Sequence, residues 1–288
     1  PLGAVQDVVL ASPVAVPGWL ARALGLVPFV YLGAAVLLVA TGSTFLICRY
    51  DPFVGFFRLS AGLDLTIYGA ALLIIGVFVG RPYCRFLCPY GALLGLVSRL
   101  SWRRVTITPA ECVRCRLCED ACPFGAITTP SPETPPARRA GKTALAVTLL
   151  ALPLLMGLGA LAGRALSPAF AHTHATIRLA ERVWLEEAGE VEGTTDQSDA
   201  FRATGLALDD LYLAAGALRA RFDTGTTILG VFAGLAAGAT LLRVSLRRTR
   251  RDYEADPALC LACGRCYRYC PVETDRGKRH RKPREAAP

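Results

Sequence analysis

The chain has 288 residues, room for one or two domains, and 53% of them are hydrophobic while only 19% are charged. Soluble domains carry roughly a quarter charged residues, so this composition argues against a purely soluble protein. The cysteine count of 11 is odd, and most of these cysteines lie in two matching runs, which disfavours a disulfide scaffold and favours metal ligation. A net charge of +9 is compatible with binding to nucleic acid, to anionic lipid or to an acidic partner protein. The positions of the basic residues in the chain must distinguish among these partners.

Four uninterrupted apolar runs predict four transmembrane helices. In chain order they cover residues 27–47, 65–79, 143–163 and 226–242. The first and third have the roughly 20 residues that a membrane helix needs, and the other two are long enough for a thin or locally adapted bilayer. The alternative is that the four runs form buried core helices. We disfavour it, because the rest of the chain is too short to cover four such helices. Gly230, Gly234 and Gly238 predict close approach of another helix, and Pro153 predicts a kink.

Basic residues predict how the helices are oriented. Residues 80–142 and 243–288 carry an excess of Arg and Lys, so both stretches are expected on the cytoplasmic side. Asp and Glu outnumber Arg and Lys in residues 164–225, which are therefore expected outside, as a small cap with helical apolar spacing over 177–187 and 201–222. Because the positive charge is assigned to the inner membrane face, we expect no nucleic-acid partner.

Two cysteine runs are the strongest motif. Both read Cys-x2-Cys-x2-Cys-x3-Cys-Pro, the bacterial ferredoxin spacing for a 4Fe–4S cluster, in which the fourth cysteine of each run ligates the other cluster. The prediction is crossed ligation of two clusters. Cluster 1 takes Cys112, Cys115, Cys118 and Cys270, and cluster 2 takes Cys260, Cys263, Cys266 and Cys122. Zinc, the alternative for four thiolates, is typically held by paired Cys-x2-Cys knuckles instead.

The third and fourth helices form a hairpin that returns the chain to the side it left, so the two runs are expected to meet. The predicted fold class is an α-helical membrane protein with about four transmembrane helices and a cytoplasmic two-cluster, bacterial-ferredoxin-like α+β domain assembled from two separated segments. The expected parts are an N-terminal segment (1–26), transmembrane helices 1 and 2 (27–80), a C-x3-C-P element with an amphipathic segment (81–104), ferredoxin motif 1 (105–130), a linker (131–142), helix 3 (143–163), an external helical loop (164–225), helix 4 (226–243), ferredoxin motif 2 (244–275) and a basic tail (276–288). The chain begins at Pro1 rather than Met, which fits a processed product or a fragment.

A further cysteine pair, Cys84-x3-Cys88-Pro89, lies just beyond the second predicted helix. If helical, the two thiols are one turn apart and are suited to a shared metal or a redox disulfide, whereas the plainer interpretation is two small apolar residues at a helix end. Cys48-Arg-Tyr-Asp51-Pro52 is a plausible shortened copy of this element. In the predicted topology Cys48 lies at the outer end of the first helix, and it stays unassigned.

His172 and His174 lie just outside the third predicted helix. An imidazole near the membrane surface is able to deprotonate a quinol or bind a metal, because its pKa lies near neutrality. An interfacial polar loop is the alternative, and the sequence favours it. The basic tail is expected near anionic lipid or an acidic electron donor.

Three stretches resemble membrane polyferredoxins of the NosR and NapH type, of which NosR is named as a regulator of nitrous oxide reductase. They are GRPYCRFLCPYGALLGL (80–96), ECVRCRLCEDACPFGAI (111–127) and ICRYDPFVGFFRLS (47–60), the last of which is most similar to the C-terminal transmembrane and ferredoxin region of NosR. Members of this family usually carry two C-x3-C-P elements, whereas only one is intact here. NosR proteins also have a flavin domain before the helices, so FMN would belong to an upstream domain outside this chain.

The resemblance implies a multi-pass protein of the bacterial cytoplasmic membrane that transfers electrons in support of a periplasmic reductase or its maturation. Two 4Fe–4S clusters on the cytoplasmic face would pass electrons across or into the membrane. The implied partners are membrane lipid, a soluble or membrane redox partner, and a periplasmic reductase or its assembly factors. Two alternatives stay open: a quinol dehydrogenase subunit of the NapH kind, with quinone as a further cofactor, and a metal-centre assembly or sensor protein without bulk electron flow.

Overall fold

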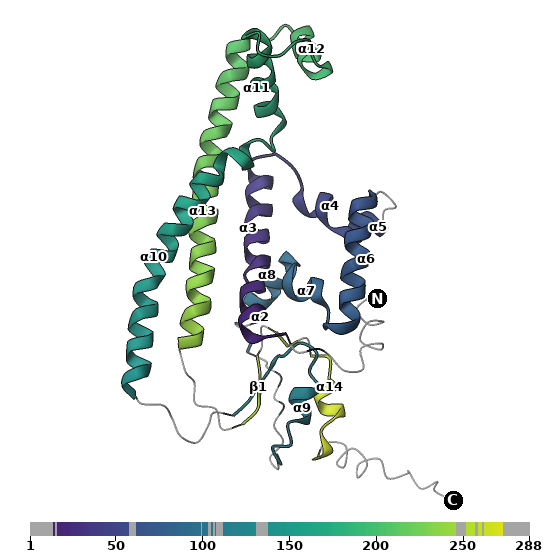
Figure 1. Ribbon diagram of the computed structural model, residues 1–288, viewed down its shortest axis with the longest axis vertical. Helices are drawn as coiled ribbons and strands as arrows, with labels where there is room; N and C mark the ends of the chain where they lie inside the picture. Colours follow the sequence, from purple (N-terminus) through teal and green to yellow (C-terminus); the bar gives the residue numbers. More distant parts are fainter. Residues whose placement is uncertain are drawn as a thin grey trace, which may run out of the picture. The chain divides into compact units, whose positions relative to one another are not determined.

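The computed structural model is mostly helical (Figure 1). It describes residues 14, 16–57, 62–98, 100–102, 105, 107, 112–130, 138–245, 252–256, 259–260 and 262–272. The chain divides into two compact units. We call Pro1–Pro28, Ile67–Lys142 and Leu246–Pro288 the cysteine-rich unit, and Phe29–Thr66 and Thr143–Ser245 the helical unit.

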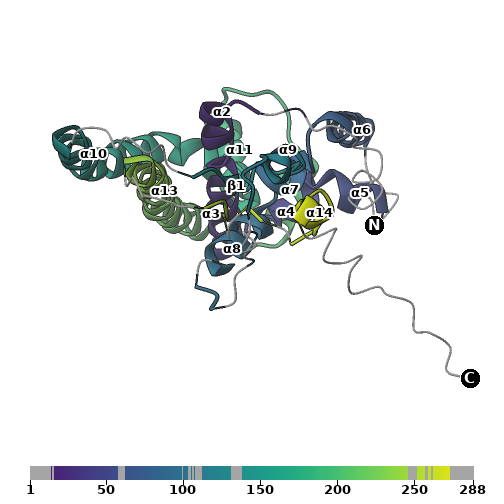
Figure 2. The same ribbon diagram turned by 90° about the horizontal axis from the view of Figure 1, so that it is seen from below.

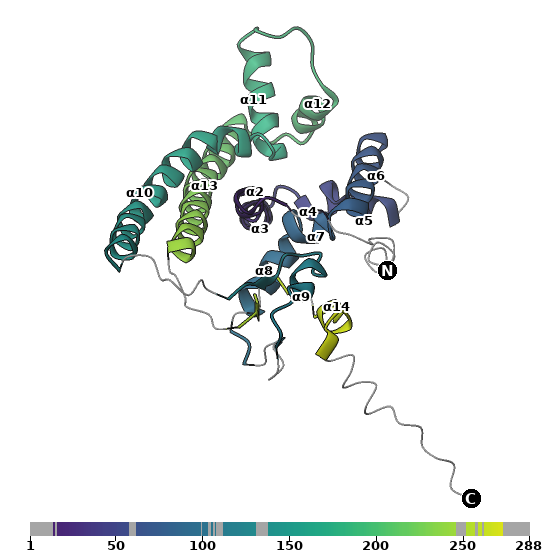
Figure 3. The same cartoon turned by 60° about the horizontal axis from the view of Figure 1, so that its bottom comes forward.

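Two long helices dominate the helical unit, α10 (Arg138–Ala171) and α13 (Leu208–Ser245). They lie side by side in all three ribbon views (Figure 1, Figure 2, Figure 3). Their backbones touch through glycines, because a Cβ on Gly159 would overlap the carbonyl oxygen of Gly230 and a Cβ on Gly163 would overlap that of Thr226. Such close approach of small residues is typical of helix pairs in lipid. The predicted glycine face of residues 230–238 is the face that meets α10.

Both long helices continue past the predicted transmembrane segments. The third predicted helix, 143–163, is part of a helix that ends only at Ala171 and runs through Pro153 and Pro168. The fourth, 226–243, is the second half of a helix that begins at Leu208. The segment expected as an external loop, 164–225, therefore includes the end of α10 and the first half of α13.

Two shorter helices, α11 (Ala175–Glu187) and α12 (Asp196–Ala203), complete this end of the helical unit. Helix α11 packs on α13 around a small core in which Val183 and Phe222 are fully buried. The predicted helix over 177–187 is present, whereas the one over 201–222 is divided because α12 ends before Gly205, which has a φ of 71°. Glycine accepts that left-handed conformation without steric cost, so the chain turns there.

Among the residues that the structure describes, three helices are long and apolar enough to cross a membrane: Gly18–Ala40, Leu145–Ala171 and Leu208–Arg243. The remaining predicted span corresponds to α6 (Leu63–Phe78), which is a shorter apolar helix, so the fourth crossing stays a prediction. The first span lies nearer the N-terminus than predicted, since it includes α2 (Gly18–Leu24) and α3 (Val27–Ala40) and ends before residue 47.

The early end of α3 has a local cause at Gly42, which has a φ of 72°. The Ser43 N–H donates to the Leu38 carbonyl at 2.9 Å, and the Gly42 N–H donates to the Val39 carbonyl at 3.1 Å. These two bonds form a Schellman motif, in which a left-handed glycine closes the last helical turn. The apolar run continues past Gly42, but the helix does not.

Glu186 ties α11 to α12. Its side chain is 4% exposed, accepts from Arg182 Nε and Ser198 Oγ at 2.9 Å each, and pairs with Arg202 Nη2 at 2.9 Å. Burial by itself would raise the pKa of Glu186, but the hydrogen bonds from Ser198 and Arg182 and the charges of both arginines outweigh it, so the pKa lies below its ordinary value. A carboxylate held this way stabilises the fold only while it is ionised.

We expect Glu186→Gln to lower the midpoint of thermal unfolding of the detergent-purified chain by several degrees at pH 7. Because the folded-state pKa is depressed, the stabilisation is present above the ordinary glutamate pKa of about 4.3 and is lost as the pH falls through the folded-state value. The difference between the two proteins should therefore disappear in acid. Trp184 fluorescence follows the region directly, since it lies on α11.

Exposed Glu190 is the matched control, and its change to glutamine should leave the midpoint unchanged at both pH values. Equal midpoints for Glu186→Gln and the unaltered chain at pH 7 would contradict the role assigned to this carboxylate.

In the cysteine-rich unit, β1 (Ile127–Thr128) and β2 (Glu254–Ala255) form a two-stranded antiparallel sheet. Ile127 pairs with Ala255 and Thr128 with Glu254. The unit also contains two one-turn helices, α9 (Leu117–Asp120) and α14 (Arg265–Arg268), and the helices α7 (Pro82–Phe86) and α8 (Pro89–Ser98). Helices α9 and α14 contact each other. The sheet and these one-turn helices join segments that lie far apart in the sequence.

Candidate metal centre

The antiparallel strand pair brings the two cysteine runs together. Strand β1 follows the first run and β2 precedes the second, and the Asp256 N–H extends the pairing by donating to the Ala126 carbonyl at 2.7 Å. Ile107, Ile127 and Tyr253 form a small buried core here. Half-buried cysteines of both runs pack against it: Cys112, Cys118, Cys122 and Cys266. Because the strands are antiparallel, the end of the first run lies beside the start of the second.

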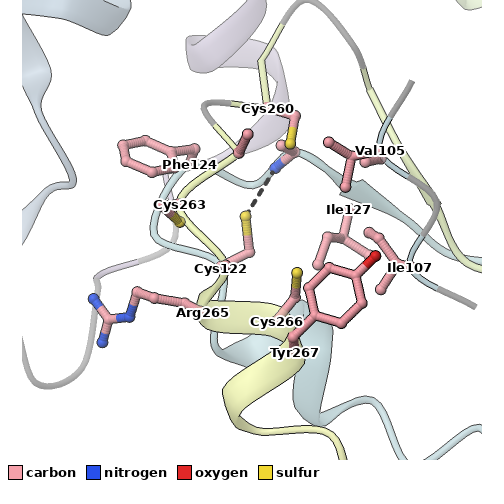
Figure 4. A pocket seen from close by; sticks show the side chains of 14 residues that line it. Val105, Ile107, Cys122, Phe124, Ile127, Cys260, Cys263, Arg265, Cys266 and Tyr267 are labelled. Atoms are coloured by element: carbon pink, nitrogen blue, oxygen red, sulfur yellow. Dashed lines mark hydrogen bonds between the residues drawn. The ribbon is translucent and has the colours of Figure 1, made fainter. Parts of the chain in front are cut away.

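Two hollows result, each lined by three cysteines of one run and the fourth of the other. The larger is a cavity of about 350 Å³ (Figure 4). Its cysteines are Cys122, Cys260, Cys263 and Cys266. The cysteines of the second hollow are Cys112, Cys115, Cys118 and Cys270. These are the two sets that the crossed arrangement predicts, and Ile107 lines both hollows.

The two cysteine loops have the same backbone design. Arg114 and Arg116 have φ values of 52° and 64°, and Ala262 and Gly264 occupy the corresponding positions with 51° and 74°. In each loop the second of these residues is the N-cap of the one-turn helix that follows. A left-handed residue reverses the direction of the chain, so cysteines three apart can face one hollow. The non-glycine residues cost about 1–2 kcal/mol each in this conformation.

The donor set of each hollow fits a 4Fe–4S cluster, and the larger hollow also has the space for one. A cubane needs four thiolates at its corners, and each hollow offers four cysteines. In the part of the chain that the structure describes, no three His, Cys, Asp or Glu side chains are close enough together to hold a single ion. The four cysteines of the larger hollow are instead spread around a cavity.

The ligand sulfurs lie in partly apolar surroundings. Burial raises the pKa of the Cys118 and Cys266 thiols, and nearby backbone N–H groups offset part of that effect. Cys122 Sγ accepts a hydrogen bond from the Ala126 N–H at 3.4 Å, drawn as a dashed line in Figure 4. Metal ligation requires the thiolate form, so we expect cluster insertion to release protons.

The Cys84–Cys88 element packs on the turn that follows Cys122. Gly80 is buried against Pro123, since a Cβ on Gly80 would lie only 2.7 Å from the Pro123 carbonyl oxygen. The Arg81 guanidinium carbon lies 5.8 Å from the ring centre of Phe124. The element is thus held beside the larger hollow. The sequence contained no signal for Gly80 as a contact residue, because nothing in its spacing points to Pro123.

Cys84 lies on α7 and is exposed, whereas Cys88 is half-buried between α7 and α8, and neither is in a disulfide. Gly91, in the first turn of α8, sits on the Cys84 carbonyl, where a Cβ would lie 2.7 Å from the oxygen. This tight corner fixes the angle between the two helices. A shared metal or redox role for the two thiols stays a prediction.

The predicted copy of this element around Cys48 has the same local architecture. Helix α4 (Leu46–Tyr50) is followed by Asp51 and by α5 (Pro52–Phe57), as α7 is followed by Cys88 and α8. Asp51 occupies the position of the second cysteine, and its Oδ1 accepts from the Phe53 N–H at 2.9 Å. Asp51 therefore caps α5, while Cys48 is exposed and stays unassigned.

Both predicted quinol-site histidines make local contacts in the helical unit. His174 is the N-cap of α11, where its Nδ1 accepts from the Thr176 N–H at 3.2 Å. His172 Nδ1 lies 3.3 Å from Glu181 Oε2. These contacts give each imidazole a structural role at the start of α11. A quinol site at these residues stays a prediction.

Two family models match the cysteine-rich unit, and both are described as a 4Fe-4S binding domain. One matches residues 65–108, which include the Cys84–Cys88 element, and the other matches residues 105–128, which include the first cysteine run. The second run lies outside both matched ranges. No solved structure matches the chain significantly.

Three curated relatives match parts of the chain. The chain is 41% identical over 68 residues to the putative electron transport protein YccM of Escherichia coli, which covers 24% of this chain and 19% of the relative. It is 32% identical over 142 residues to protein NirI of Paracoccus denitrificans, covering 44% and 20%. With the regulatory protein NosR of Pseudomonas aeruginosa it shares 39% identity over 61 residues, covering 21% and 8%. The chain thus spans about a fifth or less of the length of these relatives.

Proposed function

We propose that this NosR/NapH-type iron–sulfur membrane protein transfers electrons through two 4Fe–4S clusters held at the cytoplasmic face of a bacterial inner membrane, and that it serves a periplasmic reductase or its maturation. The family matches and the relatives NirI and NosR support iron–sulfur electron transfer linked to a reductase system. The observation that carries the two-cluster proposal is the pair of hollows, each lined by cysteines of both runs.

In this proposal the chain holds the two clusters close together and partly shields them from water. The proposed ligands are Cys112, Cys115, Cys118 and Cys270 for cluster 1 and Cys260, Cys263, Cys266 and Cys122 for cluster 2. When bound, each cluster supplies a one-electron redox centre. Ile107 is 7% exposed and lines both hollows, so one buried side chain lies against both sites. That proximity favours electron exchange between them.

The proposed route toward the membrane leaves cluster 2 through the Cys84–Cys88 element. The contacts of Gly80 with Pro123 and of Arg81 with Phe124 support this route, because they hold the element against the turn after Cys122. Helix α6 directly precedes the element in the chain. The excess of Arg and Lys in residues 80–142 and 243–288 supports a cytoplasmic position for both runs.

The test is iron and sulfide analysis with an EPR redox titration of the full chain, purified anaerobically in detergent. We expect about eight iron atoms per chain and magnetic coupling between two reduced clusters, since two cubanes hold four irons each. Cys48→Ser is the matched control, because it removes an exposed cysteine that the proposal leaves unused. Zinc in place of iron, or only about four iron atoms per chain, would refute the two-cluster proposal. Clusters that form but are not reversibly reduced and oxidised in the titration would favour the assembly or sensor alternative.

A further inference from the structure

Arg85 lies between the two cysteines of the Cys84–Cys88 element and is directed at the loop of the larger hollow. One of its terminal nitrogens, Nη2, lies 3.5 Å from the point where a Cβ on Gly125 would be. Gly125 lies in the turn after Cys122, because its N–H donates to the Cys122 carbonyl at 3.3 Å. The guanidinium carbon of Arg85 lies 4.8 Å from the ring centre of Phe86, which holds the side chain over α7. The cation therefore sits beside one proposed ligand of cluster 2.

The surroundings of this cation strengthen its field. Arg85 is half-buried, and its Nε is shielded from solvent without a hydrogen-bond partner among the described residues. Burial lowers the pKa of the guanidinium and the nearby Cys122 offsets part of that effect, yet arginine stays charged at any pH at which proteins fold. A charge in a medium of low dielectric constant acts more strongly than one in water. A buried donor beside a thiolate ligand also fits a bound, negatively charged centre.

The two arginines that line the hollows differ from Arg85. Arg116 lines the second hollow but is exposed, so water and salt screen it. Arg265 lines the larger cavity, but its guanidinium points away from the four cysteines (Figure 4). The two sites therefore receive unequal positive fields, and the larger hollow has the less screened one.

We propose that Arg85 is a potential-setting residue: its cation raises the reduction potential of cluster 2 above that of cluster 1, so that an electron entering the pair settles on the cluster beside the Cys84–Cys88 element. Reduction adds one negative charge to a cluster, and a nearby cation stabilises the reduced form. Cluster potentials are known to depend on net charge, hydrogen bonds to sulfur and solvent exposure. This inference rests on the proposed function, since it requires two clusters.

An EPR redox titration of the full, cluster-loaded chain tests it with three variants. In Arg85→Gln we expect one midpoint potential to fall, narrowing the gap between the two clusters, by an amount equal to about a tenfold change in the reduced-to-oxidised ratio, or about 59 mV for one electron. Arg85→Lys keeps the cation and should show a smaller shift in the same direction. Arg49→Gln is the matched control, because this exposed arginine follows Cys48 as Arg85 follows Cys84, lies over Tyr50 and lines neither hollow, so both potentials should stay unchanged.

The outcomes separate the two proposals. If the unaltered chain lacks two clusters, the proposed function fails before any variant is compared. If it has two clusters and their potentials are the same in Arg85→Gln, only the role of Arg85 is refuted. Equal shifts of both clusters, or an equal shift in Arg49→Gln, would likewise refute it. If Arg85→Gln loses iron, the uncharged variant Arg85→Met is titrated in its place, and unchanged potentials in that variant overturn the assignment.

Discussion

In Cys122→Ser, the cluster held by the second cysteine run will be lost and the one held by the first run will remain. Cys122 belongs to the first run in sequence, but it lines the hollow formed by Cys260, Cys263 and Cys266. A serine oxygen is a poorer ligand for iron than a thiolate. We therefore expect iron to fall from about eight to about four atoms per chain, measured with sulfide and the EPR spectrum of the reduced protein.

Two other variants identify which cluster survives. Cys115 and Cys263 sit in the middle of their runs, so their clusters do not depend on crossed ligation. The EPR spectrum of Cys122→Ser should match that of Cys263→Ser, and the spectrum of Cys270→Ser should match that of Cys115→Ser. The reverse matching would mean that each run holds its own cluster and that the crossed arrangement is wrong.

The two cysteine sets are predicted from local information alone, and their ligation of two clusters stays a prediction. The gaps Cys-x2-Cys-x2-Cys let one loop surround a cluster, and the fourth cysteine before Pro123 or Pro271 directs the chain to the other site. Nothing else about the two segments had to be known, and the hollows contain the same two sets. The short strand pair that joins the two runs was not predicted. Its strands, Ile127–Thr128 and Glu254–Ala255, have two residues each and are too short to show the alternation of apolar and polar residues that marks a strand.

Helix ends were harder to predict from the sequence. An apolar run indicates that a segment is buried or in contact with lipid, but it does not indicate where the backbone leaves the helical conformation. The run over 27–47 passes Gly42 without a charged residue, yet a left-handed glycine ends α3 there. In α13, Arg219, Arg221 and Asp223 interrupt the apolar pattern, which made the helix look as if it began later. Charged residues continue a helix readily outside the hydrocarbon region, so hydropathy marks the span and not the helix.

The contacts around Gly80 and Arg85 were beyond sequence reasoning for a different reason. Gly80 meets Pro123 across more than forty residues of chain, and only the packing of α7 on the cluster loop brings them together. The C-x3-C-P pattern drew attention to its two cysteines. The residues that connect the element to the cluster loop are instead a glycine beside it and an arginine inside it.

Gly80→Val should separate the Cys84–Cys88 element from the cluster loop while leaving both clusters in place. Any Cβ at Gly80 would lie 2.7 Å from the carbonyl oxygen and 2.8 Å from the Cβ of Pro123, so the backbone must move. In proteoliposomes, we expect reduced clusters to be reoxidised about tenfold more slowly or worse by a lipid-soluble oxidant, since misplacement by about 1 Å costs up to roughly 100-fold in enzyme reactions. Stopped-flow absorbance of the clusters measures the rate.

Reoxidation by soluble ferricyanide should be unaffected, because that oxidant reaches the clusters from water. Gly157→Val is the matched control on α10, where a Cβ would meet no atom within 4 Å, and it should behave like the unaltered chain with both oxidants. If the thiols carry the electron, the double variant Cys84→Ser with Cys88→Ser will reproduce the slow rate of Gly80→Val. If Gly80→Val is reoxidised by the lipid-soluble oxidant as fast as the unaltered chain, the route to the membrane lies elsewhere. If only the double variant keeps the unaltered rate, the two thiols do not carry the electron, and the element acts as a spacer that positions cluster 2.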